Sequence, residues 1–147
     1  MRRAERADIP AIAAILADDY LGKHREKLTD PLPASYGAAF AEIEANPHAY
    51  MLVCERAGVV IGYLQLWFLR GLAKQGALQA RLSDVQIASA QRGGGIGGRM
   101  VKHAIELARQ RGCKLMFLIS HESRKDAHRF YRQLGFTPDY QGMMLTL

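Results

Sequence analysis

The stretch SAQRGGGIGGRMVKHA, residues 89–104, places five glycines within six positions and then changes at once to an amphipathic helical pattern. Such a loop is costly to order, because glycine loses more backbone freedom on folding than any other residue. Successive N–H groups at the start of a helix, together with the helix's positive end, suit an anion such as a pyrophosphate. The absence of side chains lets that anion approach the backbone. The stretch therefore predicts an anion-binding turn that opens a helix.

Two common phosphate-binding loops do not match this turn. A Walker loop ends in Gly-Lys-Ser/Thr, whereas Gly98 is followed here by Arg99 and Met100. Gly93, Gly95 and Gly98 superficially fit the dinucleotide pattern GxGxxG. That pattern also requires an acidic residue about 20 positions further on, at the end of a strand, and none follows. Both nucleotide interpretations are therefore excluded.

The segments around the turn alternate between strand and helix patterns. Helical spacing of apolar residues, caps and stop signals predict helices over 9–22, 35–45, 97–111 and 124–135. Runs of branched and aromatic residues predict strands over 49–56, 59–69, 80–88, 114–120 and 142–147. No repeat or linker interrupts the chain. The order indicates one α/β domain with a mixed sheet.

Charge and composition narrow the class of protein. Residues 92–132 hold ten basic and three acidic residues, a net charge of +7, so the rest of the chain sums to −1. An anionic ligand near the glycines and a solvated helical surface both fit this positive segment. No run approaches the roughly 18 apolar residues of a membrane span, and the start lacks a secretory core. Cys54 and Cys113 match no metal or redox spacing, so we expect a reduced, cytoplasmic protein.

Three motifs together resemble one known family. RGGGIG (92–97) has the form Q/R-x-x-G-x-G/A, DVQIA (84–88) precedes it, and AHRFYRQLGF (127–136) follows it after one helix and one strand. This arrangement resembles the GNAT superfamily of acetyl-CoA-dependent N-acetyltransferases, and the opening at 2–16 extends the resemblance over nearly the whole chain. The resemblance implies a single GNAT domain over residues 1–147. It also implies a central mixed, mostly antiparallel sheet of about six or seven strands flanked by four helices, with the fourth and fifth strands splayed apart.

The resemblance also implies acetyl-CoA as co-substrate, without a metal. The strand at 80–88 would pair its backbone with the pantetheine arm, and the N–H of Ile87 or a neighbour would polarise the thioester carbonyl. The glycine turn would hold the pyrophosphate. The cofactor-binding residues implied are Val85, Gln86, Ile87, Arg92, Gly93, Gly94, Gly95, Ile96, Gly97, Gly98, Arg124 and Tyr131.

Two residues are candidates for proton transfer. Tyr131 matches the family tyrosine that protonates the departing thiolate, although it also lies in the apolar stripe of its helix and could simply pack. Asp84 is the candidate base for the acceptor amine, with an exposed, merely solubilising aspartate as the alternative. Arg124 stands where many members carry an asparagine that contacts pantetheine. It could instead contact a phosphate or remain solvated.

These inferences predict an N-acetyltransferase that moves acetyl to a primary amine of a small molecule or peptide, by direct attack in a ternary complex. Residues 16–45, which carry both acidic and basic side chains, would line the acceptor pocket. The alternative is a GNAT-fold sensor that binds acyl-CoA without turnover. A nucleic-acid-binding protein is a further rival, but the basic segment lacks interleaved aromatic residues, so neither nucleic acid nor membrane is expected as a partner. A homodimer is conceivable because a final strand at 142–147 would offer a sheet edge.

Overall fold

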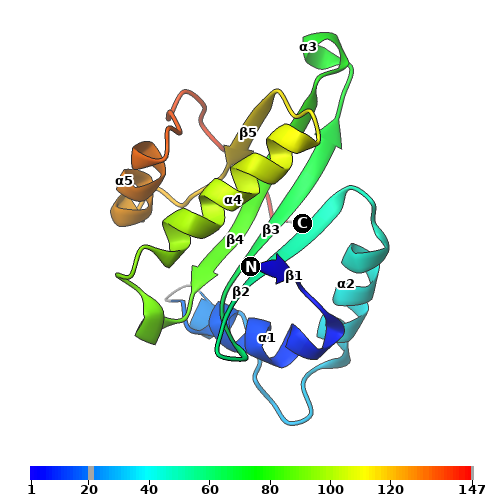
Figure 1. Cartoon of the computed structure of the whole chain (residues 1–147), viewed down its shortest axis with the longest axis vertical. Helices are drawn as coiled ribbons and strands as arrows, with labels where there is room; N and C mark the ends of the chain where they lie inside the picture. Colours follow the sequence, from blue (N-terminus) through cyan, green and yellow to red (C-terminus); the bar gives the residue numbers. More distant parts are fainter. Residues whose placement is uncertain (20–21, 147) are drawn as a thin grey trace.

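The computed structural model describes residues 1–19 and 22–146 and shows one five-stranded sheet in the order β1-β2-β3-β4-β5 (Figure 1). Neighbouring strands are antiparallel except β4 and β5, which are parallel. The strands are β1 (Arg2–Arg3), β2 (Ala49–Arg56), β3 (Val59–Arg70), β4 (Leu78–Ile87) and β5 (Leu115–Leu118).

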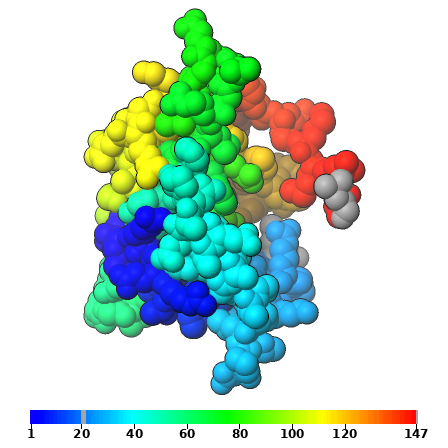
Figure 2. Space-filling view, turned by 90° about the vertical axis from the view of Figure 1, so that its right-hand side faces the viewer, coloured from blue at the N-terminus to red at the C-terminus, as the bar shows by residue number. Residues whose placement is uncertain are grey.

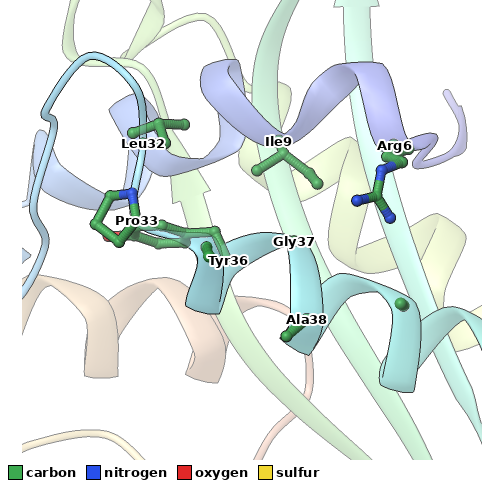
Figure 3. A pocket seen from close by; sticks show the side chains of 9 residues that line it. Arg6, Ile9, Leu32, Pro33, Tyr36, Gly37 and Ala38 are labelled. Atoms are coloured by element: carbon green, nitrogen blue, oxygen red, sulfur yellow. The ribbon is translucent and has the colours of Figure 1, made fainter.

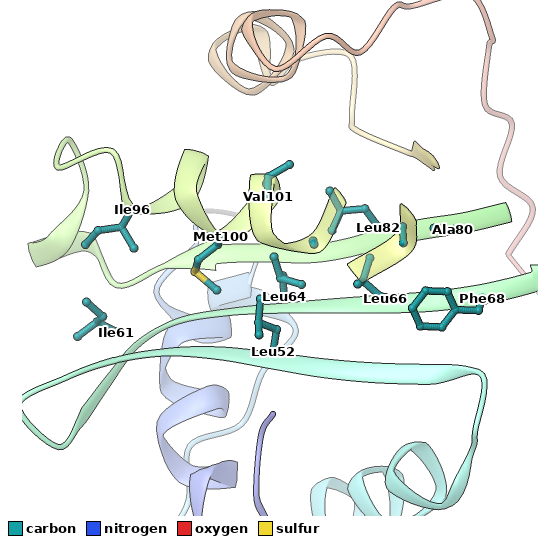
Figure 4. Packing of buried hydrophobic residues seen from close by; sticks show 12 residues of the cluster. Leu52, Ile61, Leu64, Leu66, Phe68, Ala80, Leu82, Ile96, Met100 and Val101 are labelled. Atoms are coloured by element: carbon teal, nitrogen blue, oxygen red, sulfur yellow. The ribbon is translucent and has the colours of Figure 1, made fainter. Parts of the chain in front are cut away.

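Helices cover both faces of this sheet. They are α1 (Ile9–Ala17), α2 (Ala34–Ala45), α3 (Ala73–Gly76), α4 (Ile96–Gln110) and α5 (Lys125–Gln133), with short 3-10 turns at Arg6–Asp8, Gly22–His24 and Ser89–Gln91. The helix α4 packs on one face, while α1 and α2 lie on the other (Figure 4). The helix α5 lies beyond β5 at the edge of the sheet (Figure 1).

The main core lies between α4 and the sheet. Met100, Val101 and Ala104 of α4 are fully buried against Leu64 and Leu82 of the strands (Figure 4). The apolar stripe that the sequence predicts for this helix is therefore confirmed. Burial of this stripe fixes α4, and with it the glycine turn at its N-terminus, against the end of β4.

The expected number of strands is wrong for the described part of the chain. It forms five strands rather than six or seven, and five helices rather than four, because the short α3 follows β3. Residues 142–146 form no strand, and Leu147 lies outside the described residues. A strand needs a neighbouring edge to accept its hydrogen bonds. At Gly142 the segment lies next to the Ile119 side chain, just after β5, without forming a strand.

The N-terminal region also differs from expectation. A two-residue strand, β1, pairs Arg2 and Arg3 with β2, although no strand was expected there. The first helix ends at Ala17 instead of continuing to Gly22, and positions 20 and 21 of the expected helix lie outside the described residues. Within the described chain, no helix has both the length and the apolar character needed to cross a membrane.

Candidate active site

The pairing between β4 and β5 stops halfway along β4. Four pairs join the two strands, from Gln79 with Leu115 to Leu82 with Leu118. The strand β4 then continues over residues 83–87, while β5 ends. Beyond Leu82, β4 therefore has no strand partner on its β5 side, at the place where a splay between 80–88 and 114–120 is expected.

A β-bulge coincides with the point where the strands part. Two steps along β3, from Tyr63 to Gln65, face three steps along β4, from Gln86 back to Ser83. The extra residue places Asp84 in the left-handed region, with φ at 53°. A bulge of this kind bends a strand and re-aims its side chains. Before the bulge Ala80 and Leu82 face the α4 core, and after it Val85 and Ile87 do.

Asp84 is exposed and has no hydrogen bond or ion pair within residues 1–19 and 22–146. Its charge nevertheless acts on two phenols, since it helps to raise the pKa of both Tyr63 and Tyr131. Asp84 therefore lies near both tyrosines with a carboxylate that no protein group occupies. A non-glycine residue in a left-handed conformation costs free energy, and such residues cluster at functional sites.

Tyr131 is half-buried between two aromatic rings. Its ring packs edge-on against Phe130 at 5.0 Å and Phe136 at 5.7 Å between centroids. Burial raises the pKa of Tyr131, the charge of Arg124 opposes the rise, and that of Asp84 adds to it. The phenol is therefore protonated at neutral pH and can donate its proton. The structure shows packing and proximity to Asp84 together, so the two interpretations of Tyr131 are compatible.

The glycine turn forms an open cradle at the N-terminus of α4. Gly93 and Gly95 adopt φ values of 84° and 70°, which only glycine adopts without strain. The first hydrogen bond of α4 runs from the Arg99 N–H to the Gly95 carbonyl at 3.2 Å, so the preceding N–H groups lack acceptors within the helix. A Cβ atom built on Gly93 or Gly98 would meet no atom within 4 Å. Open space, bare N–H groups and a positive helix end suit a pyrophosphate.

Two arginine side chains of the turn donate hydrogen bonds to backbone carbonyls of the same segment. The Arg92 Nε atom donates to the Ile87 carbonyl at 2.9 Å, and the Arg99 Nη1 atom donates to the Gly94 carbonyl at 3.2 Å. Both side chains therefore hold the path of the turn. A ligand in the cradle would meet mainly backbone.

The residues just after α1 contact both the segment that follows β4 and the one that precedes α5. The Asp18 carboxylate accepts a hydrogen bond from the Ser89 N–H at 2.6 Å, and this bond lowers the pKa of Asp18. The neighbouring Asp19 pairs with Arg124 at 3.2 Å. Arg124 is therefore paired with a carboxylate, while its side chain remains 38% exposed. These two acidic residues belong to the segment expected to line the acceptor pocket.

A buried polar pair beside the bulge was not expected from the sequence. The Tyr63 hydroxyl donates to the Gln65 Oε1 atom at 3.0 Å, and burial raises the pKa of Tyr63. The Gln65 Nε2 atom and the Ser120 hydroxyl, near the end of β5, are buried without a protein partner among the described residues. Buried polar groups usually find one. In the sequence, the sign of such a pair was Gln65, a polar residue between two leucines in an otherwise apolar strand.

The hollow shown in Figure 3 lies between α1 and α2, away from β4 and α5. Its lining is largely apolar, and it contains neither Asp84 nor Tyr131. Its residues are Arg6, Ile9, Leu32, Pro33, Ala34, Tyr36, Gly37, Ala38 and Ala41. Among the residues described, His, Cys, Asp and Glu side chains form no group of three that could hold a metal ion.

Comparison with known proteins gives the class. Residues 9–136 match the model of the acetyltransferase (GNAT) family. The chain therefore belongs to this family and is an acetyl-CoA-dependent N-acetyltransferase, a transferase of the acyltransferase class.

Particular relatives span different shares of the chain. An uncharacterized N-acetyltransferase of Bacillus subtilis, YhfO, is 26% identical over 95% of this chain and 90% of its own length. The aminoalkylphosphonate N-acetyltransferase of Salmonella typhimurium is 30% identical over 66% of this chain, and the match spans 62% of that enzyme. A crystal structure described as a transcriptional regulator from Bacillus halodurans C-125 superposes with a TM-score of 0.97. It is 40% identical, and the match covers 99% of this chain and 97% of that one.

Proposed function

We propose that this domain, residues 1–147, transfers acetyl from acetyl-CoA to a primary amine of a small molecule or peptide, by direct attack in a ternary complex. The observation that carries the proposal is the parting of β4 from β5, which leaves residues 83–87 without a partner on the β5 side. An unpaired strand can bind an extended ligand by main-chain hydrogen bonds. Asp84 lies in this unpaired stretch, and its charge helps to raise the pKa of the Tyr131 phenol.

Backbone groups of this chain would hold acetyl-CoA, whose thioester supplies the activated acetyl group. In the turn at 92–98, the N–H groups that follow Arg92 suit the pyrophosphate, because the cradle is open and lies at the positive end of α4. The Arg92 N–H itself donates to the Ser89 carbonyl at 3.2 Å. Val85, Gln86 and Ile87 would pair with the pantetheine arm. The N–H of Ile87 or a neighbour would donate to the thioester oxygen. Arg124, which pairs with Asp19, would contact the coenzyme only through a change of partner.

Two side chains would move the protons. Asp84 accepts a proton from the acceptor ammonium, and the resulting amine attacks the acetyl carbon. The new carbon–nitrogen bond forms as the carbon–sulfur bond breaks, and Tyr131 donates its proton to the departing sulfur. The nitrogen then loses its second proton, which returns through solvent to the Tyr131 phenolate, so that the amide and the free thiol are both neutral. The raised pKa of Tyr131 keeps that proton in place before the reaction. No protein nucleophile is required.

The acceptor we favour is a small amine that also carries an anionic group. The segment between α1 and α2 holds Lys23, Arg25 and Lys27, cations that can attract such a group. The similarity to the aminoalkylphosphonate N-acetyltransferase supports the same class. The Asp84 carboxylate would bind the ammonium group of this acceptor. A peptide N-terminus lacking a nearby anion would use the carboxylate alone.

A second candidate function is a sensor that binds acyl-CoA without turnover. The Bacillus halodurans protein that is 40% identical to this chain is described as a transcriptional regulator, which favours the sensor. Tyr131 and the free carboxylate of Asp84 favour catalysis, since a sensor needs no proton donor. If the protein instead bound nucleic acid through its basic segment, 92–132, the affinity would fall steeply as the salt concentration rises.

The test is release of free coenzyme A thiol across amino acids, polyamines, aminophosphonates and peptides, together with calorimetry of acetyl-CoA binding. We expect turnover with at least one amine that carries an anionic group. Tyr131→Phe should bind acetyl-CoA normally and turn over slowly. Binding without turnover on the whole panel would establish the sensor. Absence of acetyl-CoA binding would overturn both functions.

A further inference from the structure

The strand β4 carries two opposite charges on the face of the sheet that is turned away from α4. Leu82 is buried in the core on the α4 side, so alternation along the strand points Arg81 to the other face. Beyond the bulge, Val85 packs against the same core, which leaves Asp84 on the face of Arg81. Both charged side chains are exposed. The strand therefore presents a guanidinium and a carboxylate on one face, with Ser83 between them in the sequence.

The Arg81 guanidinium is not used by the fold. It forms no hydrogen bond or ion pair with any residue that the structure describes. By contrast, Arg2, Arg92 and Arg124 are each paired with a carboxylate. The planar fork of a guanidinium matches the oxygens of a carboxylate or phosphonate. Arg81 can therefore bind an anionic group of a ligand without giving up a contact of the fold.

Aromatic side chains flank Arg81 in its row of the sheet. Trp67 of β3 and Phe117 of β5 are its register partners on the two sides. Both are half-buried, and neither is part of the two hydrophobic clusters that the described residues form. Apolar surroundings lower the local dielectric constant, which strengthens the attraction between a guanidinium and an anion.

A polar pair lies beside the stretch between the two charges. Ser83 pairs across the sheet with Gln65 of β3, which is only 5% exposed. The Gln65 Nε2 atom is a buried donor without a partner among residues 1–19 and 22–146. Buried donors of this kind are usually satisfied by protein, water or ligand. The polar groups near Ser83 thus leave a donor unused, in the part of the sheet that separates Arg81 from Asp84.

Two further segments lie on the same side of the sheet. Leu118 packs against the α4 core, so Ile119 points to the other face, and there it lies next to Gly142 of the C-terminal segment. The space-filling view shows the red C-terminal segment and the light-blue segment after α1 projecting on the side away from the yellow α4 (Figure 2). Both segments therefore project on the side of the sheet that carries Arg81 and Asp84.

Building on the transferase function proposed above, we propose that Arg81 is a specificity-determining residue, which binds the anionic group of an acceptor whose ammonium is bound by Asp84. The two Cα atoms are separated by three positions of an irregular strand, a distance of about 7–10 Å. Paired charged hydrogen bonds from Arg81 would hold a phosphonate or carboxylate. The acceptor class is therefore a short aminoalkyl phosphonate or carboxylate, bound along β4 with its amine at the bulge.

The first experiment compares two acceptors of similar length, aminoethylphosphonate and propylamine, which differ in the anionic group. The release of free thiol by the full chain gives kcat and KM for each acceptor. We expect the protein to prefer aminoethylphosphonate. Arg81→Gln should raise the KM for aminoethylphosphonate at least about tenfold, while its kcat and both constants for propylamine change little. Arg81→Lys should recover part of the loss, because it keeps the charge without the fork.

Two variants serve as comparisons. Arg6→Gln is the matched control: Arg6 is an exposed arginine at the hollow between α1 and α2, away from β4, so this variant should behave as the unmodified chain. Arg25→Gln tests the cations of the segment after α1 and should have a smaller effect than Arg81→Gln. An unchanged KM in Arg81→Gln, or a larger increase in Arg25→Gln, would overturn the assignment of Arg81.

The second experiment measures binding without turnover, by calorimetry of aminoethylphosphonate with protein saturated with coenzyme A, which keeps the phosphonate out of the glycine turn. We expect binding, and we expect Arg81→Gln to weaken it at least about tenfold. Such a loss in a protein that acetylates no amine would support the Arg81 site and refute the transferase. Equal turnover of propylamine and aminoethylphosphonate would refute the Arg81 site and leave the transferase standing. A protein that neither binds nor acetylates aminoethylphosphonate would overturn the proposal.

Discussion

The two halves of β4 differ in almost every physical respect. Residues 79–82 pair with β3 on one side and β5 on the other, and Ala80 and Leu82 are fully buried. Residues 83–87 pair with β3 only, contain the bulge at Asp84, and are only partly buried or exposed. The regular half supplies packing that holds the sheet together. The irregular half supplies the open edge and the free carboxylate, and the reaction that we propose would take place where the pairing ends.

A comparison of two aspartates makes the same distinction. Asp8 is buried and accepts hydrogen bonds from both terminal nitrogens of Arg2, at 2.7 and 2.9 Å, and from the Glu5 N–H at 2.8 Å. Asp84 is exposed and has no such partner in the described chain. The first carboxylate is fully used in holding the N-terminus together. The second is available to a ligand.

The largest effect on stability is expected in the paired half. Leu82→Ala should lower the free energy of unfolding by about 2–5 kcal/mol, because it leaves a cavity in a close-packed core. Urea unfolding followed by circular dichroism measures this change. The affinity for acetyl-CoA, measured well below the melting temperature, should change little by comparison. A stability loss under about 1 kcal/mol would show that this half is not the packing center.

The next largest effect concerns turnover at the candidate active site beside the unpaired half of β4. Tyr131→Phe should lower kcat about 100-fold, as for loss of a general acid, while the melting temperature changes little. An assay of thiol release measures kcat, and thermal unfolding measures the melting temperature. Tyr50→Phe, on β2, is the control and should keep full turnover. Because burial raises the pKa of Tyr131, the alkaline limb of the rate profile should lie above the ordinary range for tyrosine. A Tyr131→Phe enzyme with normal kcat would limit Tyr131 to packing.

An intermediate effect is expected at the structural carboxylate. Asp8→Asn should lower the free energy of unfolding by about 1.5–3 kcal/mol at neutral pH, because charged hydrogen bonds are lost. Hydrogen bonds from Arg2 lower the pKa of Asp8 in the folded protein. Its contribution is therefore fully present above the unfolded value of about 3.9 and is lost as the pH falls through the folded value. Urea unfolding at several pH values should show the two proteins converging in acid. A constant difference across that range would contradict the linkage.

Local patterns in the sequence predicted the regular parts of this molecule well. The stripe of α4, the strands β2 to β4 and the glycine turn follow from periodicity and from glycine's conformational freedom. The bulge at Asp84 did not follow, because one extra residue changes no composition and depends on how β3 pairs with β4. The link from Asp19 to Arg124 joins residues far apart in the sequence, so local patterns carry no signal for it. Of the strand expected at 142–147, the described residues 142–146 form none, because strand formation depends on a partner edge as well as on propensity.

The smallest effect separates strain from chemistry at the bulge. Asp84→Gly should raise the free energy of unfolding by about 0.5–1 kcal/mol, because glycine adopts a positive φ without a Cβ clash. The same change should lower turnover, since the candidate base is removed. Ala57→Gly is the matched control: Ala57 lies in the β2–β3 turn with φ at 49°, so the variant should gain similar stability and keep full activity. Urea unfolding and thiol release on both variants test the pair. If Asp84→Gly gained stability and also kept its turnover, the left-handed residue would be a geometric consequence of the bulge, and deprotonation of the amine would fall to another group. If both variants gain stability and only Asp84→Gly loses turnover, the strain at the bulge is a cost that the fold bears to present that carboxylate.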